Sequence, residues 1–145
     1  MREALLRARD FDLPDWWIVS GALYNTVWNH LTGRPSGYGI KDFDLFYFDA
    51  SDLSWEAENL VIMRGEEIFR RLAKPVEIRN QARVHLWYEP RFGQKREPRG
   101  SSRESIGQFA SRAHSVGVRI GRAGELEVFA PYGLEDIFSF RIAPN

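Results

Sequence analysis

The segment 40–49 constrains the fold of this chain more than any other. Its aromatic and aliphatic residues have the composition of a β-strand, in which successive side chains point to opposite faces. Asp42 and Asp44 therefore share one face, about 7 Å apart, while Phe43 and Leu45 share the other. Aspartate is disfavoured inside strands, so this pair favours a site for a divalent cation such as Mg²⁺, which prefers carboxylate oxygens. A solvated strand end that carries two acids would give the same pattern.

The composition indicates a globular domain without cysteine. Of the 145 residues, 43% are hydrophobic, and the 20 basic residues balance the 20 acidic ones. Zero net charge argues against bulk attraction to nucleic acid or an anionic membrane, and thiol-based sites are excluded. No stretch reaches the roughly 20 apolar residues of a membrane span. We expect one cytoplasmic domain over residues 1–145, whose abrupt end is consistent with C-terminal truncation.

A strand-to-helix turn precedes the acidic strand. A short apolar strand, 16–19, leads through Ser20 and Gly21 into a helix, 22–31. Free N–H groups and the positive end of a helix dipole make such a turn an anion site, and glycine lets a phosphate approach the backbone. The alternative is a plain turn in which Ser20 caps the helix. The helix is expected to bury Leu23, Val27 and Leu31.

Residues 76–88 alternate almost completely between apolar and polar side chains. This pattern predicts one long strand, or two strands with a break at Asn80 and Gln81. Its polar positions are Glu77, Arg79, Gln81, Arg83, His85 and Trp87. A solvated face would also be polar, but tryptophan and histidine suit contact with a ligand better than solvation.

Capping and turn signals predict the remaining elements. We expect helices over 2–10, 55–72 and 134–138, a helix that opens at the capping box of Ser101, strands over 116–120 and 125–130 joined as a hairpin, a loop over 32–39, and a mobile basic loop over 88–100.

Three features now stand together: the Ser-Gly turn, the Asp-x-Asp strand and a later strand with an acid on its polar face. Phosphoryl transfer requires N–H groups for phosphates, carboxylates for metal ions, and positive charge nearby. The order of these features resembles the nucleotidyltransferase fold of the DNA polymerase beta superfamily. More narrowly, the sequence is similar to a bacterial family of small nucleotidyltransferase-like proteins, many without an assigned function. The similarity is carried by VSGAL at 19–23, WN at 28–29, KDFDLFYFD at 41–49, NQARVHLWY at 80–88, VGVR at 116–119 and APYGLED at 130–136.

The fold that we expect is α/β (α+β), with a mixed, largely antiparallel sheet and helices mostly on one face. The resemblance implies that Ser20 and Gly21 bind the phosphates of a nucleoside triphosphate. It further implies that Asp42 and Asp44 bind two Mg²⁺ ions, with Mn²⁺ as the alternative. We choose Glu77 as the third acid, which in the superfamily lies on a neighbouring strand; it would hold one ion and accept the proton of the attacking hydroxyl.

Basic and aromatic residues complete the expected site. Lys41, Arg79 and Arg83 are candidates for phosphate contacts, and His85 and Trp87 for contacts with the substrate. Two departures from the superfamily pattern stand out. Twenty residues separate the turn from the first aspartate, which is longer than usual, and alanine follows the turn glycine where the pattern has a second serine or glycine.

The expected function is Mg²⁺-dependent transfer of a nucleoside monophosphate from a nucleoside triphosphate to an acceptor hydroxyl. The acceptor stays open between a small molecule, RNA and protein, and no membrane partner is expected. One alternative is a non-catalytic nucleotide-binding or protein-interaction module with the same fold; another is a metal-dependent nuclease. Three intact acids favour the enzyme over the module, and a nuclease would leave the Ser-Gly turn without a role.

Overall fold

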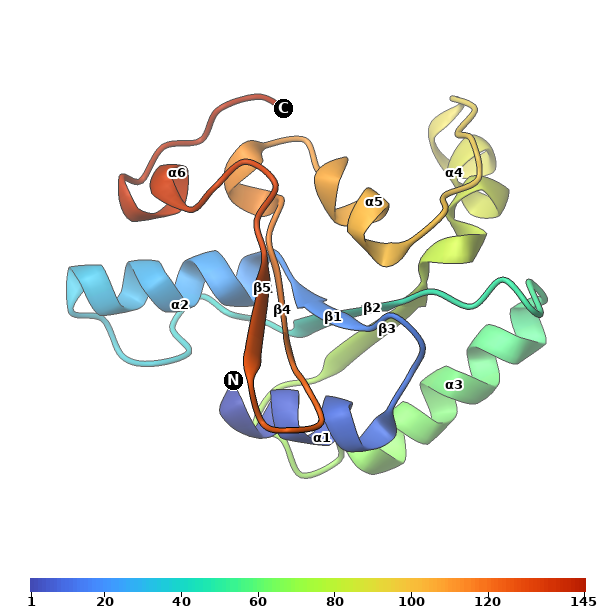
Figure 1. Ribbon diagram of the computed structural model, residues 1–145, viewed down its shortest axis with the longest axis horizontal. Coiled ribbons are helices and arrows are strands. Elements are labelled where there is room, and N and C mark those ends of the chain that lie inside the picture. The colour runs from blue at the N-terminus through green and yellow to red at the C-terminus, as the bar shows by residue number, and fades with distance from the viewer.

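A five-stranded sheet forms the centre of the molecule in the computed structural model, which describes residues 1–145 (Figure 1). The elements run along the chain as α1 (Arg2–Phe11), β1 (Trp17–Val19), α2 (Gly21–Thr32), β2 (Phe43–Tyr47), α3 (Trp55–Ile68), β3 (Val76–Asn80), the 3-10 helix η1 (Gln81–Arg83), α4 (Val84–Phe92), α5 (Ser102–Gly107), the 3-10 helix η2 (Arg112–His114), β4 (Gly117–Ile120), β5 (Leu126–Phe129) and α6 (Glu135–Phe138). None of these helices is long and apolar enough to cross a membrane.

The strand order across the sheet is β3-β2-β1-β4-β5. β2 and β3 are parallel and are connected through α3, as parallel neighbours require a crossover. The other neighbouring pairs are antiparallel. The expected fold class, a mixed and largely antiparallel sheet with helices, is confirmed, but the helices do not lie mostly on one face, since α1 and α3 cover one face and α5 packs on the other.

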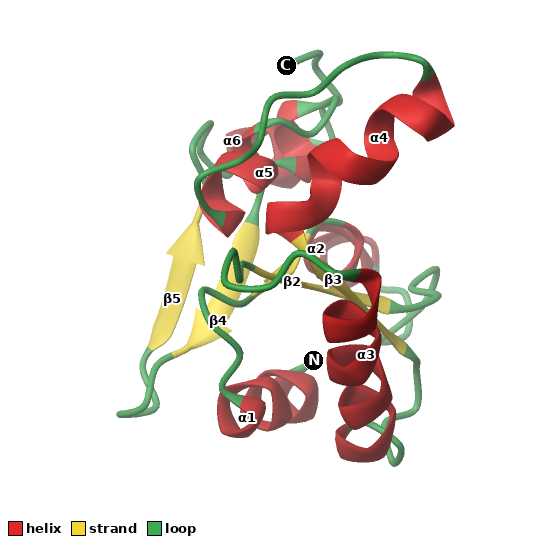
Figure 2. Cartoon of the chain, turned by 90° about the vertical axis from the view of Figure 1, so that its right-hand side faces the viewer, coloured by secondary structure: helices red, strands yellow, loops and turns green.

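The two faces of the sheet bury different sets of side chains. Phe43, Leu45 and Tyr47 alternate along β2 and pack with Ile18 and Ile78 in the main core, against α1 and α3. These two helices lie together in the lower half of Figure 2, and α4, α5 and α6 lie in the upper half. The alternation in the sequence therefore identified the core face of β2 correctly, and the opposite face of β2 carries the acid.

A smaller cluster covers the other face of the sheet. Trp17 and Val19 of β1 pack there with Ile106 of α5, and Phe46 and Phe109 stack on each other beside them with ring centroids 5.8 Å apart. α5 is short, and its start is fixed locally, because the hydroxyl of Ser101 accepts a hydrogen bond from the N–H of Glu104 at 3.1 Å, as the capping box predicts.

The largest correction concerns residues 76–88. The predicted break after β3 is confirmed, but the strand predicted beyond it is wrong, since the chain continues into η1 and α4. Asn80 stabilises this change from strand to helix. Its Oδ1 accepts from the N–H of Ala82 at 3.1 Å, which caps the new helix, and its Nδ2 donates to the carbonyl of Asp49 at 2.9 Å. The loop predicted to begin at Tyr88 consequently begins only after Phe92.

One predicted helix face is also corrected, and a buried contact of a second helix was not predicted. Leu31 of α2 is 46% exposed, and Asn29 is buried in its place, donating to the carbonyl of Tyr38 at 2.8 Å. In α3 the buried positions include Gly65, against which the Cδ1 atom of Ile78 packs so closely that there is no room for a Cβ atom. Helix spacing alone did not identify these contacts, because they depend on which loop or strand lies opposite.

Candidate active site

Asp44 and Glu77 lie side by side on adjacent strands. In the register of the sheet, Val19 pairs with Asp44 and Asp44 pairs with Glu77. Paired residues of neighbouring strands point to the same face, so both carboxylates lie on the face opposite the main core. Asp42 precedes β2 by one residue. The register agrees with the sequence-based expectation that Glu77 shares the face of Asp44.

The electrostatics of Asp44 indicate that the three acids act on one another. Burial, together with the negative charges of Asp42 and Glu77, raises the pKa of Asp44 from 3.8 to about 6, although Arg79 acts in the opposite direction. Arg79 also pairs with Glu77 at 3.0 Å and donates to the carbonyl of Ile78 at 2.8 Å. The guanidinium of Arg79 therefore supplies positive charge to this acidic group.

The acids match a divalent cation in their chemistry. Carboxylate oxygens are the ligands that Mg²⁺ and Mn²⁺ prefer, and the mutual repulsion at Asp44 is what a cation would relieve. No group of three or more His, Cys, Asp or Glu side chains is arranged to hold a metal ion in the structure. Asp42, Asp44 and Glu77 could hold one if Glu77 turned away from Arg79, with which it pairs.

The Ser20–Gly21 turn comes directly after Val19, the residue that pairs with Asp44. Ser20 has φ 57° and ψ −119°, a backbone conformation that is costly for a residue with a Cβ atom. Its hydroxyl makes no capping hydrogen bond, contrary to the alternative of a plain helix cap. The N–H groups of Gly21 and Ala22 lie in the first turn of α2, where the helix itself offers them no acceptor. The turn therefore presents unused donors beside the acids.

Tyr24 connects this turn with the acids, and the sequence analysis missed it. A Cβ atom on Gly21 would lie 3.6 Å from the hydroxyl oxygen of Tyr24. Burial and the negative charge of Asp44 raise the pKa of this tyrosine. Its ring is held between Trp28 and His114, at centroid distances of 4.7 and 4.8 Å. Only its position three residues after Gly21 on a helix could have suggested it.

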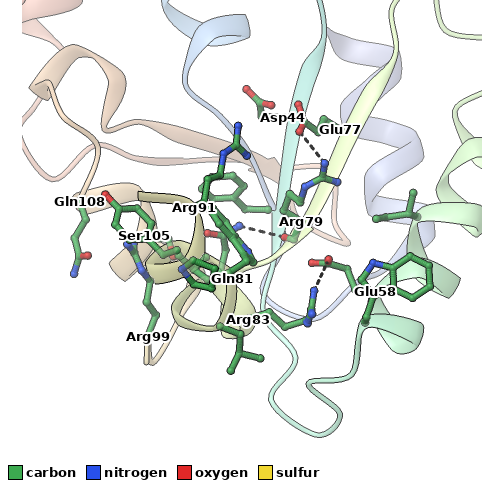
Figure 3. A pocket seen from close by; sticks show the side chains of 18 of the residues that line it. Asp44, Glu58, Glu77, Arg79, Gln81, Arg83, Arg91, Arg99, Ser105 and Gln108 are labelled. Atoms are coloured by element: carbon green, nitrogen blue, oxygen red, sulfur yellow. Dashed lines mark hydrogen bonds and ion pairs between the residues drawn. The ribbon is translucent and has the colours of Figure 1, made fainter. Parts of the chain in front are cut away.

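A cleft of about 1050 Å³ opens from the acids toward α3, α4 and α5 (Figure 3). Of the residues expected in the site, Asp44, Glu77, Arg79, Arg83 and Trp87 line it. Ser20, Gly21, Lys41, Asp42 and His85 do not line it. The strand order explains why the turn lies outside the cleft, because β1, which leads into the turn, lies on one side of β2, and β3, which leads into α4, lies on the other. The acids therefore stand between the Ser20–Gly21 turn and the cleft.

Arg83 is held by a buried ion pair. Its Nη1 donates to Glu58 at 2.8 Å and its Nε to the carbonyl of Leu53 at 2.8 Å. The side chains of Arg83 and Glu58 are 12% and 9% exposed. Glu58 also accepts from the N–H of Asn80 at 2.8 Å. A phosphate at Arg83 would have to compete with Glu58, a buried acid that no sequence signal on α3 marked.

The helix α4 changes which residues face the cleft. Arg83 and Trp87 are four residues apart and share a helix face, whereas His85 points elsewhere. The Nδ1 of His85 is enclosed and has no hydrogen-bond partner. Lys41 is exposed, next to Asp42. The expectation that one strand face would carry all these residues is therefore wrong, although Trp87 still reaches the cleft.

Comparison with known proteins assigns the class. A family model described as Nucleotidyltransferase matches residues 6–145, and the chain belongs to that family. Among solved structures, the chain is similar to one described as "The NMR structure of the protein reveals a CCA-adding enzyme head domain". That match has a TM-score of 0.80 and 29% identity, and covers 97% of this chain and 69% of the other. No curated protein matches the chain. Family and fold together support a general role in nucleotidyl transfer.

Proposed function

We propose that this protein transfers a nucleoside monophosphate from a nucleoside triphosphate to an acceptor hydroxyl, with Mg²⁺ or Mn²⁺ as the cofactor. One observation carries the proposal: Val19, Asp44 and Glu77 form one row across three strands, and the Ser20–Gly21 turn comes directly after Val19. Donors for phosphate oxygens and acids for metal ions thus adjoin each other, as phosphoryl transfer requires.

The turn would bind the triphosphate of the donor nucleotide. The N–H groups of Gly21 and Ala22 and the hydroxyl of Ser20 would donate to phosphate oxygens, supported by the positive end of the α2 dipole. Arg79, once released from Glu77, would contact phosphate with its planar guanidinium, and Lys41 would add positive charge beside Asp42. Tyr24 would help to position the donor through its hydroxyl next to the turn.

The three acids would hold the metal ions and handle the acceptor proton. Asp42, Asp44 and Glu77 would be the ligands, and a bound cation would stabilise the charge that develops on the transferred phosphoryl group. Glu77 would also accept the proton of the attacking hydroxyl. Asp44 has to lose its own proton before it can bind a cation, so its raised pKa favours activity above about pH 6.

The second candidate is a module that binds nucleotide without turnover. The ion pair between Glu77 and Arg79 favours it, because this pair neutralises the acid that catalysis needs. The acceptor of an active enzyme would be a small molecule, RNA or protein. The description of the solved match, a CCA-adding enzyme head domain, adds an RNA 3′ end to the acceptors worth testing.

The deciding experiment measures nucleotide binding and turnover separately. Each nucleoside triphosphate is titrated with Mg²⁺ by calorimetry, and pyrophosphate release is then followed with pools of RNA, protein and small-molecule hydroxyl acceptors. We expect binding and release, with Asp44→Asn inactive but folded. Binding without release from any pool would favour the module, and absence of binding would reject both candidates.

A matched pair of variants tests the turn. Gly21→Ala adds a Cβ atom at ordinary contact distance from Tyr24, whereas Gly21→Val adds bulk on the side where phosphate would approach. We expect Gly21→Val to abolish nucleotide binding with little loss of stability, and Gly21→Ala to weaken it less. Unchanged affinity in Gly21→Val would remove the turn from the site.

A further inference from the structure

The cleft contains positive charge that is not held in an ion pair. Four arginines line the cleft, and two of them are paired: Arg79 with Glu77 and Arg83 with Glu58. Arg91 and Arg99 line it as well but form no ion pair. The cleft therefore carries two guanidinium groups beyond those that its glutamates pair with.

The Arg99 side chain is partly removed from water without receiving a partner. Its Nε is enclosed and has no hydrogen-bond acceptor. Burial and the neighbouring charge of Arg96 lower its pKa, while Glu104 and Tyr88 act in the opposite direction. An enclosed charged donor without an acceptor is costly. An anion that enters the cleft would supply the missing acceptor.

A second unused polar group lies at the same end of the cleft. Ser105 on α5 is 4% exposed, and its hydroxyl has no hydrogen-bond partner. In Figure 3, Ser105, Arg99 and Gln108 lie together on one side of the cleft, and Asp44 and Glu77 lie at the other end, with the guanidinium of Arg91 extending from between them toward the acids. Arg91 of α4, Ser105 of α5 and Arg99 of the loop before α5 thus all line the same cleft.

We propose that Arg99 and Ser105 bind a phosphate group of the acceptor, with Arg91 adding positive charge along the cleft. The inference rests on the proposed function and specifies its second substrate: a phosphorylated acceptor whose hydroxyl reaches Asp44 and Glu77 while its phosphate lies at the far end of the cleft. The donor triphosphate is assigned to the other side, because Ser20 and Gly21 do not line the cleft. Guanidinium and hydroxyl donors are the groups that bind phosphate oxygens.

Trp87 adds a contact that suits one kind of phosphorylated acceptor. Its ring lines the same cleft, and an aromatic surface stacks on a base or on another flat ring. The phosphate could belong to a single nucleotide or to the phosphodiester backbone of a strand. The two sources share the same recognition chemistry at Arg99, so the experiment compares them directly.

The test is a binding experiment that needs no activity. Inorganic phosphate, a nucleoside 5′-monophosphate and a short oligonucleotide are titrated into the full chain, and the arginine Nε–H resonances are followed by NMR. We expect saturable shifts at Arg99 and Arg91. Arg99→Met should weaken binding about tenfold, as the loss of one charge-assisted hydrogen bond implies. Arg71→Met, an exposed position outside the cleft, is the matched control and should leave affinity unchanged.

Ser105→Ala separates binding from folding. Removing a buried hydroxyl that has no partner should leave the stability unchanged or raise it, yet phosphate affinity should fall. A loss of stability without loss of affinity would make Ser105 a scaffold residue and overturn its part in the subsite. An oligonucleotide that binds more tightly than the monophosphate would assign the phosphate to a strand, and equal affinity would assign it to a single phosphate group.

Two outcomes distinguish this inference from the proposed function. If a nucleoside triphosphate analogue shifts Arg99 and competes with phosphate, the cleft binds the donor and the inference is overturned. If the enzyme turns over and Arg99→Met changes neither the KM of a phosphorylated acceptor nor its phosphate affinity, the subsite fails and nucleotidyl transfer stands. Phosphate binding that depends on Arg99, without pyrophosphate release from any acceptor, would support the subsite and reject the transferase.

Discussion

Two glutamate–arginine pairs line the same cleft, with similar distances between the charged groups but very different exposure to solvent. Glu58 and Arg83 meet at 2.8 Å with side chains 9% and 12% exposed, whereas Glu77 and Arg79 meet at 3.0 Å with side chains 47% and 43% exposed. The buried pair is completed by hydrogen bonds to the backbone on two sides. The open pair lies next to Asp44, whose pKa is raised by Glu77 and lowered by Arg79.

The difference indicates which pair can change partners. Separating Glu58 from Arg83 would leave an unpaired charge in a site with little access to water, which is strongly unfavourable. Separating Glu77 from Arg79 costs little, because water and salt screen both groups. A ligand can therefore release Glu77 for a cation and Arg79 for a phosphate, while Arg83 continues to join α3 to the start of α4.

Removing the buried acid should have the largest effect on stability. Glu58→Gln leaves the guanidinium of Arg83 buried without a counter-charge, so we expect a loss of about 3–5 kcal/mol in the free energy of unfolding. Urea denaturation of the full chain measures it. Glu56→Gln, an exposed position on the first turn of α3, is the matched control. A loss below about 1 kcal/mol would mean that the pair behaves like a surface salt bridge.

Removing the open acid should instead affect chemistry. Glu77→Gln is expected to lower turnover by about 10²–10⁴-fold, the usual contribution of a general base. Its free energy of unfolding should change by less than about 1 kcal/mol. Pyrophosphate release with a working acceptor measures the first effect, and urea denaturation the second. Normal turnover in this variant would reduce Glu77 to a partner of Arg79.

The stability of the folded chain should depend on pH through Asp44, which lies beside the open pair. Because the folded pKa of Asp44 is raised to about 6 from 3.8, its contribution to stability is complete below pH 3.8 and is lost as the pH rises through about 6. Asp44→Asn removes this titration, so its stability relative to the wild type should increase over the same pH range. Parallel pH curves for the two proteins would contradict the raised pKa.

The same titration should govern metal binding. Mn²⁺ has to displace the proton of Asp44, so its affinity for the wild type should fall as the pH drops below about 6. Calorimetry or the paramagnetic broadening of nearby resonances measures this. Asp52→Asn, at a surface position outside the cleft, should keep the wild-type profile. An affinity that does not depend on pH would place the metal elsewhere.

The smallest expected effect is the coupling within the open pair. A double-mutant cycle with Glu77→Gln and Arg79→Met should give a coupling energy of about 0.2–1 kcal/mol that decreases as salt is added. The cycle with Glu58→Gln and Arg83→Met should give a larger energy that salt changes little. If the two cycles gave similar coupling energies with similar salt dependences, the two pairs could not be distinguished as buried and exchangeable.

The sequence by itself determined the elements whose signals are local. The alternation along β2, the serine cap of α3, where the hydroxyl of Ser54 accepts from Ala57 at 3.1 Å, and the hairpin of β4 and β5 all depend on residues a few positions apart. The face shared by Asp44 and Glu77 was also predictable, because alternation within each strand fixes it once the strands are adjacent.

Only the tertiary structure decided the path of the chain after β3. Residues 76–88 satisfy a strand pattern, yet Val84, Trp87, Tyr88 and Arg91 also recur at helical spacing and all line the cleft. The choice is made by distant partners: Asn80 bonds to Asp49, 31 residues away, and its N–H donates to Glu58, 22 residues away. A local pattern cannot encode such partners, because they exist only when α3 and β2 pack beside β3.

The partners of the arginines were decided in the same way. In the sequence, Arg79, Arg83 and Arg99 are equivalent cations on a polar stretch or basic loop. In the folded chain Arg79 forms an exposed ion pair that can exchange partners, and Arg83 is held in a buried pair with Glu58. The Nε of Arg99 is enclosed near Ser105 and has no hydrogen-bond partner. Burial and the distance to an acid set these roles, and both quantities arise from contacts between segments that lie far apart along the chain.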